Sequence, residues 1–199
     1  MRHLITILMS ITLVTAAMAQ NVTLTGERRA KTLEAIATAQ QPKEGETLNY
    51  TFVQTKHSPL LASDAVSKGR LTLGSDRTMH WNYTEPQAFS LVVDGDSIYT
   101  VSDGQRKTLS GAGGRMTRGL AQMMMQMTDG TSLSNDKLFE TTLTEGKGTY
   151  NAVLVPKRRD MKRMMQRVEL ILDRKTLRIK TVKITEKEDS YINIDFTLQ

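Results

Sequence analysis

The sequence of 199 residues contains no cysteine. No disulfide bond can therefore hold this fold together, and burial of apolar side chains must stabilise it instead. Cysteine is also the residue on which a bacterial lipoprotein receives its acyl anchor. We therefore expect the mature chain to carry no such anchor and to diffuse freely.

Histidine is scarce as well, and the residue patterns that accompany catalysis are missing. Beyond His3, the chain has only His57 and His80, which do not stand at the spacing of paired metal ligands on a helix or strand. There is no G-x-S-x-G nucleophile motif, and the glycine-rich segment 110–114 lacks the Lys-Ser or Lys-Thr of a phosphate-binding loop. We predict a protein that is not an enzyme and needs neither a metal ion nor another cofactor.

The longest uncharged apolar run lies at the N-terminus. Leu4–Val14 is too short to cross a hydrocarbon core of about 30 Å, and the small residues at 17–19 suit signal peptidase. We predict a signal peptide at 1–19, cleaved after Ala19, and a single periplasmic domain at 20–199. A short N-terminal anchor is the alternative, but the polar residues that follow do not form a stop-transfer segment.

Lysine and arginine outnumber the acidic residues, 27 against 21, which gives a formal net charge of +6. A basic exported protein can bind anionic lipid surfaces or acidic proteins, and export argues against a nucleic-acid partner. The densest basic run is interleaved with methionine, which favours a partner-docking edge beside an apolar opening. A solvated loop explains the run equally well. The run comprises Lys157, Arg158, Arg159, Lys162 and Arg163.

Apolar residues recur first at helical and then at strand spacing. Thr25 can cap a helix, and the apolar positions that follow it predict an amphipathic helix at 27–39. Alternating segments then predict half-buried antiparallel strands, and Asp94-Gly95 between two of them predicts a tight hairpin. The expected strands lie near 48–52, 71–73, 79–83, 91–93, 97–101, 139–144, 150–155, 168–172, 177–184 and 192–196. This pattern indicates an α+β domain with a strongly curved antiparallel sheet.

Methionine is concentrated in two places. Of the 12 in the chain, five lie between positions 116 and 127, and three more lie between 161 and 165. Methionine is flexible and polarizable, so it suits surfaces that must fit apolar partners of several shapes. The first group falls on a predicted helix that follows the glycine-rich segment. That helix is either an ordinary core helix or a mobile lid.

Five short segments occur in an order and at spacings that match a known family over most of the mature chain. They are Phe52-Val53-Gln54, Gly69-Arg70-Leu71, Trp81-Asn82-Tyr83 with Pro86, Leu91 to Gly95 with Tyr99, and Leu154-Val155-Pro156. Together they resemble the periplasmic lipoprotein carriers of bacteria, the LolA-like proteins. In that family an Arg-Pro pair helps to latch a helical lid. Ser75-Asp76 takes its place here, so we expect the lid to open more readily.

The resemblance implies an incomplete, half-open β-barrel wrapped around a helical lid, with an apolar cavity for the acyl chains of lipoproteins or another lipid. It also implies a soluble carrier that moves lipoproteins from an inner-membrane exporter to an outer-membrane acceptor, and we expect it to be a monomer. A sensor of the same fold that binds a lipid or a protein signal is an alternative, and a secreted hydrolase is a third. We expect the cavity and lid to be lined by Phe52, Met79, Trp81, Tyr83, Leu120, Met123, Met124 and Met127.

Overall fold

The computed structural model describes residues 21–109, 121, 122, 124–126 and 131–199. The helices are α1 (Gly26–Gln40), the 3-10 helix η1 (Thr131–Ser134) and α3 (Arg159–Met164), and residues 121, 122 and 124–126 also have helical backbone. The strands are β1 (Val22–Thr23), β2 (Thr47–His57), β3 (Ala65–Gly74), β4 (Met79–Glu85), β5 (Phe89–Asp94), β6 (Ser97–Ser102), β7 (Gln105–Thr108), β8 (Phe139–Glu145), β9 (Thr149–Pro156), β10 (Arg167–Asp173), β11 (Ile179–Thr185) and β12 (Tyr191–Leu198).

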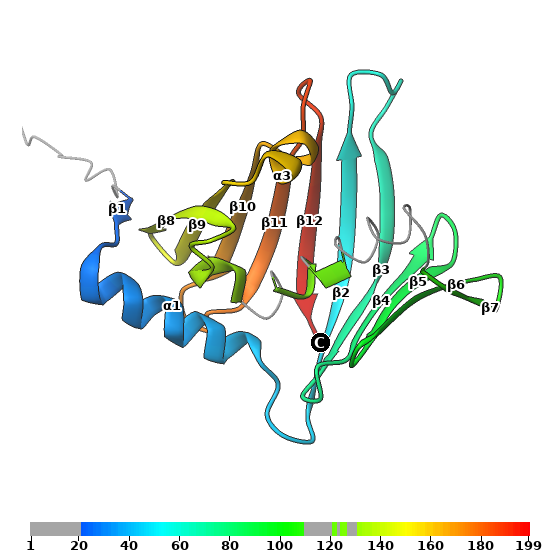
Figure 1. Ribbon diagram of the computed structural model, residues 1–199, viewed down its shortest axis with the longest axis horizontal. Helices are drawn as coiled ribbons and strands as arrows, with labels where there is room; N and C mark the ends of the chain where they lie inside the picture. The colour runs from blue at the N-terminus through cyan, green and yellow to red at the C-terminus, as the bar shows by residue number, and fades with distance from the viewer. Residues whose placement is uncertain (1–20, 110–120, 123, 127–130) are drawn as a thin grey trace, which may run out of the picture.

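These strands form one antiparallel sheet in the order β1-β8-β9-β10-β11-β12-β2-β3-β4-β5-β6-β7. Sequential strands are neighbours except where β1 joins β8 and where β12 joins β2, which brings the C-terminal strand to the middle of the sheet. The strands at the two ends of this order, β1 and β7, do not pair with each other. The sheet therefore curves without closing, as an incomplete barrel (Figure 1).

Helix α1 lies against the inner side of the sheet near β8 to β11 (Figure 1). Its buried residues are Leu33, Ile36 and Gln40, which share one face because they are three and four positions apart. The first turn of the helix is held to β8, where Arg29 Nη2 donates to the Thr141 carbonyl oxygen at 3.2 Å. The predicted helix at 27–39 is confirmed, with one more residue at each end.

The strands alternate as the sequence predicts. On β4, Met79 and Trp81 are buried and His80 between them is exposed, and β10 buries Val168 and Leu170 in the same way. Inward-facing residues from both halves of the sheet join one apolar core that also receives Leu33 and Ile36 of α1. The curved, unclosed antiparallel sheet confirms the predicted fold class. Within the described ranges, no helix has the length and apolar character needed to cross a membrane.

Some local predictions need adjustment. The hairpin between β5 and β6 is present, but Asp94 pairs with Ser97, so its turn residues are Gly95 and Asp96. Gly95 takes the positive φ, at 55°. The short strand β7 was not predicted because its four residues, Gln-Arg-Lys-Thr, are all exposed and have no apolar alternation. Likewise, the basic run contains a short helix, α3, in place of a simple loop.

Candidate functional site

An aromatic cluster occupies the inner face at the centre of the sheet. Phe52 of β2 lies at its middle, with its ring centroid 5.0 Å from that of Trp81 and 5.2 Å from that of Tyr83. Phe196 of β12 approaches Trp81 edge-on at 5.8 Å and Tyr50 at 6.0 Å. These rings meet because β12, β2, β3 and β4 are neighbours in the sheet. The cluster is a large, polarizable apolar surface.

Tyr83 gives this cluster a polar margin. Its hydroxyl donates a hydrogen bond to Gln54 Oε1 at 2.9 Å, and the side chain is half-buried. Burial raises the pKa of the Tyr83 phenol, although the hydrogen bond with Gln54 acts in the opposite direction. The phenol therefore remains neutral at physiological pH, and the cluster presents no charge of its own.

The helical segment formed by residues 121, 122 and 124–126 lies over the apolar core. Ala121 is completely buried, and Met124 and Met125 are half-buried and pack against the core. Ala121, Met124 and Met125 thus bring both small and flexible side chains to the inner side of the sheet. Methionine side chains are flexible and can fit apolar partners of several shapes.

The structure describes five of the eight side chains that we expected to line the cavity and lid. Phe52, Met79 and Trp81 are at most 2% exposed, and Tyr83 and Met124 are half-buried. All five belong to the apolar core or pack against it. The other three, Leu120, Met123 and Met127, lie outside the described residues.

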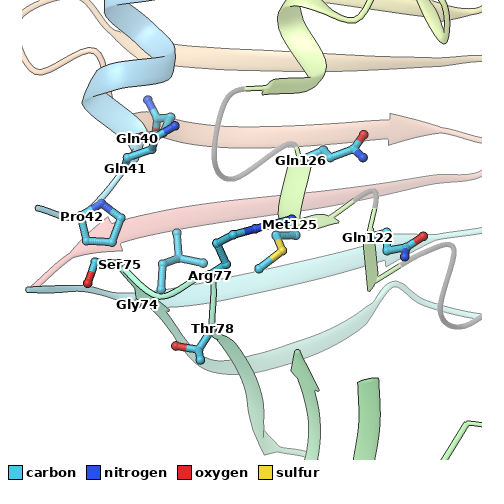
Figure 2. A pocket seen from close by; sticks show the side chains of 11 residues that line it. Gln40, Gln41, Pro42, Gly74, Ser75, Arg77, Thr78, Gln122, Met125 and Gln126 are labelled. Atoms are coloured by element: carbon cyan, nitrogen blue, oxygen red, sulfur yellow. The ribbon is translucent and has the colours of Figure 1, made fainter. Parts of the chain in front are cut away.

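A pocket of about 580 Å³ opens at the lower end of the sheet as drawn in Figure 1, beside the turn between β3 and β4. Figure 2 shows how three separate elements converge on it. The end of α1 and the residues after it contribute Gln40, Gln41 and Pro42; β3 and the turn contribute Leu73, Gly74, Ser75, Arg77 and Thr78; the helical segment contributes Gln122, Met125 and Gln126. None of the four predicted sheet residues is among the described residues that line it.

A smaller apolar cleft adjoins this pocket. It is lined by Gln40 and Leu73, which also line the larger pocket, and by residues that lead inward to the aromatic cluster. Those inner residues are Tyr50, Leu71, Ile179 and Phe196. The described surface therefore changes from polar at the lower end to aromatic at the centre of the sheet.

Gln40 is a buried polar residue that the sequence did not reveal. Its side chain is 2% exposed, its Nε2 donates to the Leu177 carbonyl oxygen, and its Oε1 accepts from the Ile179 backbone N–H at 3.3 Å. Both ends of the amide are therefore used to fix the last turn of α1 to the start of β11. No local pattern could identify it, because its partners lie 137 and 139 positions away.

The predicted basic edge lies at and around α3, at the upper end of the sheet. Lys157 Nζ donates to the Asp136 carbonyl oxygen at 2.7 Å, and Arg158 makes two hydrogen bonds to the Asp160 carboxylate, at 2.6 and 3.1 Å. The other three cations, Arg159, Lys162 and Arg163, are exposed. Since α3 precedes the first residue of β10 and the pocket lies at the opposite end of the strands, the basic edge and the pocket are far apart.

A comparison with protein families shows which family this chain belongs to. Residues 43–199 match the family model described as outer membrane lipoprotein carrier protein LolA. The chain belongs to the LolA family. The match covers every strand except β1, and it excludes α1.

Solved structures of low sequence identity are similar to this member of the LolA family. A LolA superfamily protein from Nitrosomonas europaea is 10% identical, with 85% of this chain and 91% of that chain covered and a TM-score of 0.41. Lipoprotein LppX from Mycobacterium tuberculosis is also 10% identical, with coverage of 85% and 91% and a TM-score of 0.42. The MucA/MucB complex from Pseudomonas aeruginosa gives 13% identity, coverage of 86% and 56%, and a TM-score of 0.46. No curated protein sequence matches the chain.

Proposed function

We propose that this LolA-family protein is a periplasmic carrier that binds the acyl chains of lipoproteins against the inner face of its unclosed sheet. The aromatic cluster around Phe52 and Trp81, partly covered by a methionine-bearing segment, is the observation that carries this proposal. Membership of the family supports it. In this proposal the chain is exported and cleaved after Ala19, and its partners are a membrane exporter and an outer-membrane acceptor.

Acyl binding at this place is physically reasonable because both contacting surfaces are apolar and one of them is adaptable. Burying a methylene group stabilises a complex by about 0.8 kcal/mol, so a chain of ten buried methylenes contributes about 8 kcal/mol before the costs of binding. For a chain to reach Trp81, the segment that carries Met124 and Met125 must shift away from the core. Methionine tolerates such a change of packing.

The test uses Trp81, the only tryptophan in the chain. A fatty acid brominated near the middle of its chain quenches tryptophan only on contact, so we expect saturable quenching of Trp81 that an unbrominated fatty acid reverses. Acrylamide is the control, because a side chain that is 2% exposed should be poorly quenched from water. Failure of the brominated acid to quench Trp81 saturably would refute acyl binding at this cluster.

A second experiment tests the proposed processing and separates the carrier from a sensor. The full chain is expressed with its N-terminal segment and recovered from the envelope without detergent, and N-terminal sequencing should begin at Gln20. Mass spectrometry of the recovered material should show bound lipoprotein or lipid. An uncleaved Met1 would contradict the proposed processing. A co-purified non-acylated protein in place of lipid would contradict the carrier function.

A further inference from the structure

The pocket at the lower end of the sheet is polar where it meets solvent and apolar where it meets the core. The outer pocket and the inner cleft share Gln40 and Leu73, so the two adjoin each other. The cleft itself measures only about 10 Å³, so an acyl chain can extend along it only when the surrounding side chains move apart. From Leu73 the cleft runs past Tyr50 and Phe196, and Phe196 contacts Trp81 edge-on. This gradient matches an amphiphile, which has a polar end and an apolar tail.

The polar part is supplied by amides that come from two elements. Gln41 follows the end of α1, and Gln122 and Gln126 belong to the helical segment (Figure 2). Gln122 and Gln126 are four positions apart, so they lie on one face of that segment. Each carboxamide can donate two hydrogen bonds through its NH₂ group. The pocket is thus well supplied with donors.

Arg77 is the one charged side chain among the described residues that line the pocket. It stands on the β3–β4 turn with φ at 65°, a conformation that few residues other than glycine adopt. Figure 2 shows its side chain extending from the turn toward Met125 of the helical segment. Backbone strain of this kind persists where the surrounding structure determines it, and it is frequent at ligand sites.

The turn that presents Arg77 is held by its own hydrogen bonds. The Gly74 N–H donates to the Thr78 carbonyl oxygen at 2.9 Å, and the Arg77 N–H donates to the Gly74 carbonyl oxygen at 3.3 Å. The Asp76 carboxylate accepts from both the backbone N–H and the hydroxyl of Thr78, at 3.2 and 2.7 Å, and these bonds lower the pKa of Asp76. Asp76 is therefore used within the turn, and no described ion pair includes Arg77.

We propose that this pocket binds the polar end of an acylated ligand through its carbonyl oxygens, while the acyl chain passes Gln40 and Leu73 toward the aromatic cluster. The inference rests on the proposed function and adds a head-group site to it. A guanidinium group only donates hydrogen bonds, and the glutamine NH₂ groups add further donors. The ligand class is therefore an acyl group whose head accepts hydrogen bonds, such as an ester, an amide or a carboxylate, and not a lipid with a cationic head.

The experiment compares three brominated probes that have the same chain and different heads: a fatty acid, its methyl ester and an alkyl trimethylammonium. Quenching of Trp81 is titrated in the full chain and in Arg77→Gly, a change that removes the side chain and suits the positive φ of the turn. We expect Arg77→Gly to weaken the binding of the acid and the ester about tenfold. This is the effect of losing one charge-assisted hydrogen bond. The ammonium probe should bind equally well or better.

Two further variants serve as control and replicate. Lys43→Ala removes the same charge nearby, from a residue outside the pocket lining, and should leave all three probes unchanged. Gln126→Ala should weaken the binding of the ester and the acid without affecting that of the ammonium probe. It still tests the head-group site if Arg77→Gly does not fold.

The outcomes separate the two proposals. If no probe quenches Trp81 in the parent chain, acyl binding itself is wrong. If the parent binds but both variants weaken all three probes equally, or weaken none, the head-group site is wrong and acyl binding stands.

Discussion

At the scale of single residues, one glycine explains how the aromatic cluster fits on the sheet. Gly69 of β3 pairs with Phe52 of β2, and the Phe52 ring lies over the space that a side chain would fill. A Cβ atom added at Gly69 would lie 2.5 Å from Phe52 Cζ and closer still to the Asn82 carbonyl oxygen. A glycine beneath an aromatic ring on the neighbouring strand is a known way to fill such a gap.

We therefore predict that Gly69→Ala destabilises the protein by about 1–3 kcal/mol, because the new methyl group must displace Phe52 or the β4 backbone. The free energy of unfolding in urea measures this effect. Ser67→Ala is the control, since Ser67 lies on the same strand and the same side and is half-buried. A stability equal to that of the parent would mean that the Phe52 ring can move aside at little cost.

At the scale of elements, an arginine–glutamate network fixes the start of α1 to the sheet. The Glu145 side chain is 9% exposed and pairs with both Arg28 of α1 and Arg174, which follows β10. Both arginines are about half-exposed or more, so water screens part of their attraction. Glu145 ends β8 beside β1, and the network therefore joins α1 to the edge of the sheet that β1 completes.

The second prediction is that Glu145→Gln loosens α1. The charge-assisted hydrogen bond from Arg28 and the ion pair with Arg174 lose the charge of their buried carboxylate, so we expect a loss of about 1–2 kcal/mol after allowing for the exposed arginines. Amide hydrogen exchange in α1 should accelerate more than in β10. Glu27→Gln is the matched control, because the Glu27–Lys31 pair is almost fully exposed and its loss should change little. Equal exchange in α1 and β10 would show that the network does not anchor the helix.

At the scale of the whole molecule, the sequence predicted the curved sheet better than it predicted the sites on it. Alternation placed Met79 and Trp81 on one face, and the structure confirms this because a strand fixes its faces locally. Gln40 and Glu145 resembled surface residues in the sequence, yet both are buried by partners more than a hundred positions away. The pocket around Arg77 was missed for the same reason, since α1, the β3–β4 turn and the helical segment meet only in the folded chain.

The inner face of the sheet is either a plain core or a surface that opens to a ligand, and Met124 distinguishes the two. Met124 is half-buried and packs against the core from the helical segment. If the segment can move outward, the carboxylate of Met124→Asp stays hydrated. The variant should then fold with nearly the parent melting temperature, and the brominated fatty acid should no longer quench Trp81, because a charge now lies beside the acyl chain.

Leu143→Asp is the control for that experiment. Leu143 is completely buried on β8, and an unpaired carboxylate there costs several kcal/mol against a total stability of about 5–15 kcal/mol. This variant should therefore unfold, which establishes what a charge does in a closed core. If Met124→Asp unfolds to the same extent, the inner face is a closed core and does not open to a ligand. A folded Met124→Asp that still binds the probe would place the acyl chain away from the helical segment.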